Sequence, residues 1–490
     1  MKLFRTLSPA MRLLQPCLLA LPLLLAACQR DSSPVRTTAH TPPPAPATPP
    51  PTVGPTVSKL PDTALPLGLP LAETRARCVL ADGLIYTRIL RGVALDTPPA
   101  LPCSAPQTQS LQGGGRNSST SNTGPWAFHI LEIEPTQFRG SLKPVLSNDT
   151  IGGKETPSEM GKRHGALAAI NVGFFIVGTS GNEITAEGLT GEPSGLMALD
   201  GELISEAVNT RVGMVWEQGD LLSLRFPSLV SALTLETSTG QSLLVDGINR
   251  TPGTLRNCGG VGGDLTTELP RQGKVCTDAD EIIWFTPIYG TDTPAGEGSE
   301  LVLDGTGKVT AVRPRGGPVP AGGFAIAAIG SEAAKLSAAL PVGATATLKE
   351  VLTADAQPFV RTPKTLIMTG GPELIRDGAP NLQDKRDGFD PDDDPTYRTT
   401  FVSGQNPRTF AAVTTTGRIL LIVVDGRQNT WSAGMPLEDI LPVLQFFGVD
   451  RASNLDGGGS SAMSIAGTLV NKPSDGSERP VSDALLVMPP

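Results

Sequence analysis

The sequence is poor in histidine, in aromatic residues and in charge. Its 490 residues include three histidines, 4% aromatic residues and 18% charged residues. With so few histidines a histidine-rich zinc site is nearly excluded, and a divalent metal would be held by oxygen ligands. The net charge of -9 argues against a nucleic-acid-binding protein, because such proteins present a basic face.

A long membrane-spanning run is also missing. The chain begins with a basic head, an apolar stretch and small residues, MKLFRTLSPAMRLLQPCLLALPLLLAACQR, which is typical of an export signal. The apolar stretch is short and contains Pro16 and Pro22, which argues against the alternative of a membrane helix. Its end, LAAC, resembles the lipobox of bacterial lipoproteins, in which Cys28 is acylated; an ordinary secretory signal is the other alternative.

Residues 1–28 are therefore predicted to be a lipoprotein signal peptide, and the chain to be attached to a membrane of the cell envelope by an N-terminal lipid. Gln29 follows the cysteine where an Asp would retain the protein at the inner membrane, so the resemblance to diderm lipoproteins favours the outer membrane or cell surface. Glycine (55) and proline (46) are abundant. Residues 29–70 are rich in proline, cannot build a core and are expected to form an extended spacer.

Beyond Cys28 the chain has four cysteines, Cys78, Cys103, Cys258 and Cys276. Four cysteines allow three pairings, and nearest neighbours along the chain would pair Cys78 with Cys103 and Cys258 with Cys276. Disulfides persist outside the cytoplasm. Free buried thiols are the alternative.

Residues 71–490 are predicted to be one domain of the α+β class, with a mixed sheet core, flanking helices and an inserted all-β lobe at about 230–354. A capping box of Thr156 and Glu159 predicts a helix at about 157–164. Helical spacing also marks residues 435–448, where Pro442 is expected to kink or shorten the helix.

The stretch NLDGGGSSAM, residues 454–463, joins an acidic residue to a glycine loop. It lacks the lysine of a P-loop and the G-x-S-x-G pattern of a nucleophile elbow. What remains is Asp456 at a strand end, beside glycines that allow close approach to bare N–H groups. A tight turn in which Asp456 caps its own backbone is the alternative.

Six ordered blocks, this one included, resemble the phosphodiester glycosidase family over roughly residues 125–487. The other five are AAINVGFF (168–175), TGGPELIRDG (369–378), NPRTFAAV (406–413), LLIVVDGR (420–427) and SERPVSDALLV (477–487). The resemblance implies an enzyme that hydrolyses a sugar-1-phosphodiester to free sugar and a phosphomonoester, on cell-envelope or exopolysaccharide glycans. A non-catalytic glycan-binding or polysaccharide-assembly lipoprotein of the envelope is the alternative.

The chemistry of this reaction suggests which residues act. A carboxylate near an oxocarbenium-like carbon and cations near the phosphate stabilise the transition state. Asp456 is the first candidate for the catalytic carboxylate, Asp425 its possible partner and Glu478 the third. Arg408 and Arg479 are the candidates for phosphate binding, with a structural salt bridge as the alternative for each.

Further contacts to substrate are expected from hydroxyls, amides and loop N–H groups, namely those of Asn171, Thr409, Gly457, Gly458, Ser460 and Ser461. Val172 and Phe410 depart from the family pattern, in which glycine and alanine stand at these positions, and this puts the identity of the substrate in doubt. The acidic segment 384–395 is the one place considered for a Ca²⁺ site, but it lacks EF-hand spacing, so a solvated loop is favoured and no cofactor is assigned.

Overall fold

The computed structural model describes residues 56–93, 97–112, 123–178, 184–185, 188–258 and 268–490. The chain divides into two compact units, Met1–Thr52 and Val53–Pro490, and all that follows concerns the second. The predicted signal peptide, its lipid-bearing Cys28 and most of the proline-rich spacer lie outside the described residues. Within the described ranges, no helix is long and apolar enough to cross a membrane.

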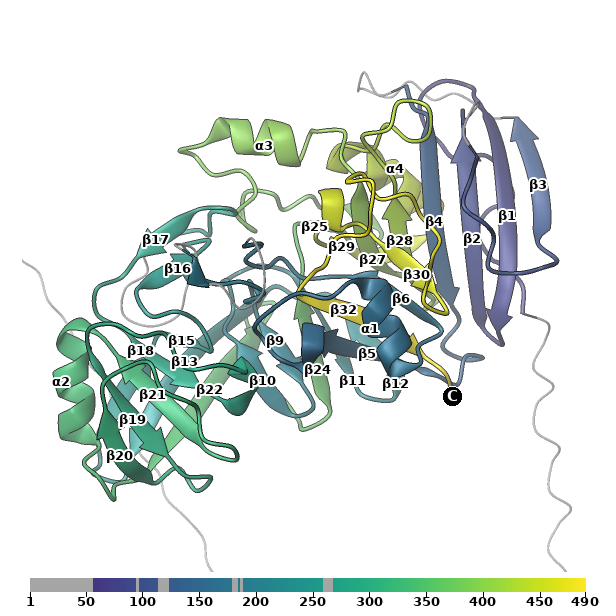
Figure 1. Cartoon of the computed structure of the whole chain (residues 1–490). Helices are drawn as coiled ribbons and strands as arrows, with labels where there is room; N and C mark the ends of the chain where they lie inside the picture. The colour runs from purple at the N-terminus through teal and green to yellow at the C-terminus, as the bar shows by residue number, and fades with distance from the viewer. Residues whose placement is uncertain (1–55, 94–96, 113–122, 179–183, 186–187, 259–267) are drawn as a thin grey trace, which may run out of the picture. The chain divides into compact units, whose positions relative to one another are not determined.

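A nine-stranded sheet forms the largest layer (Figure 1). Its order is β26 (Ala379–Pro380), β25 (Glu373–Arg376), β29 (Val449–Asn454), β27 (Arg408–Thr414), β28 (Ile419–Val424), β4 (Trp126–Ile133), β2 (Leu84–Arg91), β1 (Ala72–Ala81) and β3 (Gln107–Gln112). The odd-numbered residues of β28 enter one hydrophobic core and the even-numbered residues another. Both faces of the central strands are therefore covered, which explains why ILLIVV is apolar throughout.

A five-stranded sheet lies against the first of these cores. It has the order β31 (Thr468–Leu469), β30 (Met463–Ile465), β6 (Ala168–Asn171), β32 (Asp483–Met488) and β5 (Ser141–Leu146). Helix α1 (Pro157–His164) packs on β6, β30 and β32. Its predicted capping box is confirmed, since the Thr156 side chain accepts from the N–H of Glu159 and the Glu159 side chain accepts from the N–H of Thr156.

The middle of the chain builds three more sheets around a third core. One has β10 (Glu202–Ser205), β9 (Met197–Leu199), β24 (Thr365–Thr369), β11 (Gly213–Glu217) and β12 (Asp220–Arg225). The next has β14 (Ser242–Val245), β13 (Leu229–Thr237), β22 (Ala346–Ala354) and β23 (Gln357–Phe359). The last has β15 (Gly247–Ile248), β18 (Ile282–Phe285), β21 (Phe324–Ala328), β19 (Ser299–Leu303) and β20 (Val309–Arg313).

Short pieces complete the secondary structure. The pairs β7 (Ile184–Thr185) with β8 (Gly188–Leu189) and β16 (Thr254–Arg256) with β17 (Val275–Thr277) form two-stranded ribbons. Helix α2 (Gly330–Ala339) packs on the last sheet, α3 is Pro395–Phe401 and α4 (Leu437–Phe446) packs on β25, β26 and β29. Pro442 lies inside α4, which ends at Phe446 and is thus shorter than the stretch 435–448 that carries the helical spacing.

The expected mixed sheet core is wrong. All strand pairs of the two central sheets are antiparallel, and the described residues contain one parallel pair, β15 with β18. The fold is therefore rich in sheet, with four α-helices among the described elements. Parallel pairing usually needs crossover helices, and the four helices here are short, with seven to ten residues each.

The structure also resolves the choice among cysteine pairings. Cys78 is bonded to Cys103 and Cys258 to Cys276. Both nearest-neighbour disulfides are thus confirmed, and free thiols at these four positions are excluded.

Candidate functional site

The glycine loop, residues 456–461, follows the end of β29, and buried side chains hold it in place through hydrogen bonds. The Nδ2 of Asn171 donates to the backbone oxygen of Asp456 (2.6 Å), while its Oδ1 accepts from the Thr409 hydroxyl (2.8 Å) and from the N–H of Ala462 (3.1 Å). Asn171 is 1% exposed and Thr409 is fully buried. These two residues therefore position the loop, while their predicted contact to substrate stays a prediction.

Asp456 is partly exposed at the start of the loop. Its Oδ1 accepts from the N–H of Gly457 (2.9 Å). Withdrawal of the carboxyl group from solvent raises its pKa to about 6, a shift that the Ser460 hydroxyl, the Gly457 N–H and Arg479 oppose and that the charge of Asp483 increases. The predicted catalytic residue thus titrates near neutral pH, where catalytic carboxylates are often tuned.

Asp483 is a buried carboxyl group close to this loop, and the sequence analysis did not identify it as a site residue. Its Oδ1 accepts from the N–H of Gly173 (2.7 Å), its Oδ2 from the Ser482 hydroxyl (2.8 Å), and burial raises its pKa to about 6. A Cβ at Gly173 would overlap the Asp483 carboxylate, which explains the glycine in the corner after β6. An acidic residue opening the apolar stretch of β32 was the available sequence signal.

Asp425 is buried and saturated with hydrogen bonds from the protein. Its donors are the indole of Trp431 (2.7 Å), the Nδ2 of Asn471 (2.9 Å), the N–H of Lys472 (2.9 Å) and the Nε2 of His129 (3.1 Å). All of these partners belong to the scaffold. The arrangement favours an anchoring role for Asp425 over the predicted partnership with Asp456.

Glu478 is likewise tied to the scaffold. It accepts from the N–H of Ser158 (2.9 Å) and from the Ser158 hydroxyl (2.5 Å), in the first turn of α1, and burial raises its pKa. A carboxylate at a helix N-terminus caps free N–H groups. Glu478 therefore fixes α1, and the structure gives no support to a catalytic role.

A cavity of about 350 Å³ opens over the glycine loop. It is lined by Tyr397, Thr400, Phe401, Asn406, Arg408, Arg427, Gly457, Gly458, Gly459 and Arg479. Helix α3, which follows the acidic segment, supplies the first three of these. Three guanidinium groups around one cavity make it suited to an anionic ligand.

The three arginines differ in how far they are available. Arg408 is 1% exposed, and it donates from Nε to the oxygen of Met435 (2.7 Å) and from Nη2 to backbone oxygens that include that of Gly404 (3.0 Å). Its burial lowers its pKa to about 9. Arg408 mainly cross-links backbone carbonyls, so neither its predicted phosphate contact nor the alternative salt bridge describes its main bonds.

Arg427 and Arg479 lie against the glycines. The Nη2 of Arg427 donates to Asn406 Oδ1 (2.8 Å), and Arg479 donates from Nη2 (2.6 Å) and Nε (2.9 Å) to one oxygen of Asp475. A Cβ at Gly459 would overlap Nη2 of Arg479, and a Cβ at Gly458, which has a positive φ of 60°, would lie 3.2 Å from Nη2 of Arg427. Glycine at these positions therefore lets both guanidinium groups approach the loop. Arg427, which the sequence analysis did not predict, becomes a candidate for phosphate binding beside the predicted Arg479.

The two serines of the loop are buried. Ser460 interacts with the Asp456 carboxylate and accepts weakly from Nη1 of Arg479 (3.5 Å), so it links the acid to the cation. The Ser461 hydroxyl has no hydrogen-bond partner in the part of the chain that the structure describes. Gly457 and Gly458 line the cavity, as expected of contacts to substrate.

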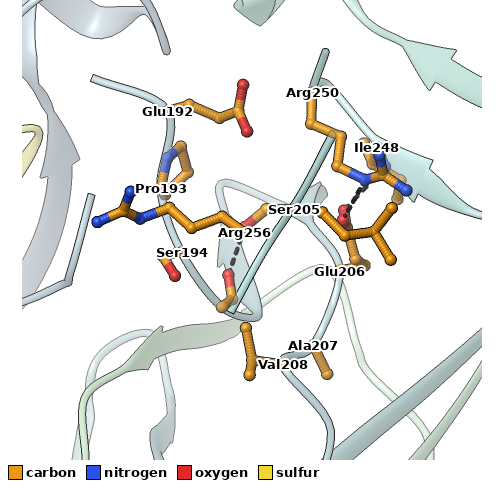
Figure 2. Close-up of a pocket in the computed structure, with 12 residues that line it drawn as sticks. Glu192, Pro193, Ser194, Ser205, Glu206, Ala207, Val208, Ile248, Arg250 and Arg256 are labelled. Atoms are coloured by element: carbon orange, nitrogen blue, oxygen red, sulfur yellow. Dashed lines mark hydrogen bonds and ion pairs between the residues drawn. The ribbon is translucent and has the colours of Figure 1, made fainter. Parts of the chain in front are cut away.

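A second, smaller cavity lies beside β10 and contains a network of buried charges (Figure 2). Arg250 pairs with Glu206 (2.8 Å) and Glu281 (2.5 Å), and burial raises the pKa of Glu192 to about 8. The volume is only about 30 Å³. This space is comparable to that of a water molecule, and it cannot hold a sugar.

The acidic segment 384–395 is neutralised by basic side chains. Asp384 pairs with Arg398 (2.8 Å), Asp392 with Lys385 (2.7 Å) and Asp393 with Arg271 (3.0 Å). Within the described ranges no three acidic, histidine or cysteine side chains cluster as metal ligands would. The carboxylates of this segment thus have partners other than Ca²⁺.

The chain matches a known family in its C-terminal part. Residues 297–488 match the model of the phosphodiester glycosidase family. The SPbeta prophage-derived protein YomE of Bacillus subtilis is 36% identical over 86 residues, which are 18% of this chain and 13% of that protein. The chain thus spans a small part of this curated relative.

Two solved structures resemble the fold over most of the chain. A protein of Burkholderia pseudomallei described as exported has 28% identity and a TM-score of 0.74, covering 89% of this chain and all of that one. A hypothetical protein of Synechocystis has 20% identity and a TM-score of 0.57, covering 83% of this chain and 74% of its own. The latter similarity shows the fold alone.

Proposed function

We propose that the protein, whose residues 297–488 match the model of the phosphodiester glycosidase family, hydrolyses sugar-1-phosphodiesters in cell-envelope or exopolysaccharide glycans. The observation that supports this best is the cavity at the glycine loop. Asp456, whose pKa is raised to about 6, begins the loop whose glycines line this cavity together with Arg427 and Arg479, and the charge of Arg479 acts on its carboxyl group.

In the proposed reaction, water attacks the anomeric carbon and the bond from this carbon to the phosphate oxygen breaks. The phosphomonoester leaves with the bond electrons, and the proton released by water passes to Asp456 or to solvent. Since phosphate is a good leaving group, it needs little help from a general acid. The role of the ionised Asp456 is to stabilise the positive charge that develops at the anomeric carbon. Arg427 and Arg479 stabilise the phosphate oxygens.

The test identifies both products and the bond that breaks. Aryl and alkyl sugar-1-phosphodiesters are incubated with the protein in H₂¹⁸O, and ¹⁸O is expected in the free sugar because the carbon–oxygen bond breaks. Asp456→Asn is expected to lower release strongly, while Asp377→Asn, at a carboxylate whose side chain is 74% exposed, leaves it unchanged. Undiminished release by Asp456→Asn, or ¹⁸O in the phosphate, contradicts the proposal.

The alternative is a glycan-binding envelope protein without turnover. It is favoured by the anchoring of Asp425 and Glu478, which leaves Asp456 as the one predicted carboxylate next to the cavity. It predicts that sugar phosphates raise the unfolding temperature without any product in the labelled-water assay.

The proposal includes export to the cell envelope and attachment through Cys28. The two disulfides fit an oxidising compartment, and the similar Burkholderia protein is described as exported. Cys28→Ser is expected to move the protein from the membrane fraction to the soluble fraction, and an unchanged membrane fraction would refute the lipid anchor.

A further inference from the structure

A second large cavity lies far from the glycine loop in sequence. It has a volume of about 550 Å³ and is bordered by β10, β18, β21 and β22 and by the turn between β19 and β20. Ligand sites usually have roughly 300–1,000 Å³. The cavity is therefore large enough for a ligand, and none of its lining residues has a role in the reaction proposed above.

Aromatic side chains form one wall of this cavity. The rings of Trp284 on β18 and Phe324 on β21 lie 4.8 Å apart between centroids and are tilted by 40°. The indole N–H of Trp284 has no hydrogen bond to any residue in the described ranges. A tryptophan offers both an apolar ring and a hydrogen-bond donor.

Polar groups without partners face the same space. The carboxylate of Glu202 on β10 and the hydroxyl of Thr347 on β22 line the cavity, are exposed, and have no hydrogen bond or ion pair within the described chain. The cavity thus offers a carboxylate acceptor and a hydroxyl in addition to the indole donor.

The charges of this cavity disfavour an anionic ligand. Arg361 is the cation on this cavity, and its Nε and Nη2 bind the two oxygens of Glu350 (3.0 Å each), while its Nη1 donates to the oxygen of Gly201 (2.7 Å). Since Glu350 neutralises the charge of Arg361, the carboxylate of Glu202 gives the cavity a net negative charge. A phosphate or acidic peptide would be repelled.

From this arrangement we infer that the cavity binds a neutral oligosaccharide. Sugar rings present apolar C–H faces that pack on aromatic rings, and their hydroxyls donate to carboxylates such as Glu202. Their ring and hydroxyl oxygens accept from the indole of Trp284. The site would hold a neutral stretch of glycan at a place separate from the cavity over the glycine loop.

Calorimetric titration of the purified protein with cellohexaose, maltohexaose and N-acetylchitohexaose tests this inference. We expect saturable binding of at least one. Thr347→Trp, which fills the cavity, abolishes it, and Glu202→Gln weakens it about tenfold through loss of a hydrogen bond to a charged acceptor. The matched controls Val351→Trp, on the same strand at a residue that is 62% exposed, and Glu297→Gln bind like the wild type.

Absence of saturable binding for all three sugars overturns the inference, and so does wild-type binding by Thr347→Trp. Titration of the Asp456→Asn variant separates this site from the proposed reaction. Because sugar binding to the second cavity needs no turnover, this variant is expected to bind like the wild type. Retained binding with no hydrolysis by the wild type supports the site and contradicts only the reaction. Hydrolysis without binding of any probe contradicts only the site.

Discussion

Replacing Asp483 with asparagine removes a buried charge next to the proposed catalytic acid. The pKa of Asp483 is about 6 in the folded chain against an ordinary value of 3.8, a difference that corresponds to about 3 kcal/mol. Between these two pH values the folded chain binds a proton that the unfolded chain has lost. The free energy of unfolding therefore falls as pH rises from about 4 to about 6, and the full cost persists above pH 6.

Asp483→Asn abolishes this cost, although it also disturbs the hydrogen bond from Ser482, a loss of about 1 kcal/mol. We expect the variant to be more stable than the wild type by about 2 kcal/mol at pH 8 and less stable by about 1 kcal/mol at pH 4. Reversible urea unfolding at both pH values measures the difference. An equal change in stability at pH 4 and pH 8 would refute the reasoning.

The same substitution also affects the neighbouring acid. The charge of Asp483 raises the pKa of Asp456, so its removal lowers that pKa. The acidic limb of kcat/KM is then expected at lower pH in Asp483→Asn, and a limb at the wild-type position would show that the two carboxyl groups are not coupled.

Three further substitutions separate binding from stability. Arg479→Gln is expected to lower kcat/KM by about 10- to 100-fold, through loss of a charged contact to phosphate, with the unfolding midpoint in urea little changed; a normal kcat/KM would remove Arg479 from the site. Arg408→Gln is expected to cost about 3 kcal/mol of stability, because it leaves several buried carbonyls without donors, and unchanged urea unfolding would contradict this. Cys258→Ser opens a loop with a sequence separation of 18 and is expected to cost about 3 kcal/mol; an unchanged urea midpoint would show that this bond constrains little.

The local features of the fold could be predicted because they depend on neighbouring residues. The capping box at Thr156 is confirmed. The direction of strand pairing could not be predicted, since apolar strands buried on both faces suggest parallel sheets and here pair antiparallel.

The candidate site was predicted in its loop but less well around it. Asp456 and the glycines lie at the cavity or beside it, because a glycine loop after a strand has few local alternatives. The environment of Asn171, Arg408 and Asp425 depends on contacts between residues distant in sequence, which a one-dimensional pattern does not contain. These polar residues are buried to bind the backbone and each other, and sequence alone does not distinguish such a role from substrate binding.

The pH dependence of kcat/KM, measured on a sugar-1-phosphodiester with the wild type and Asp456→Asn, tests the central claim most directly. In the proposed reaction Asp456 acts as an ionised carboxylate, and its pKa is raised to about 6, so the wild-type value is expected to rise about tenfold per pH unit below pH 6 and to level off above it. The residual activity of Asp456→Asn is expected to lack this limb. The same limb in both proteins would contradict the assignment of Asp456 as the catalytic group.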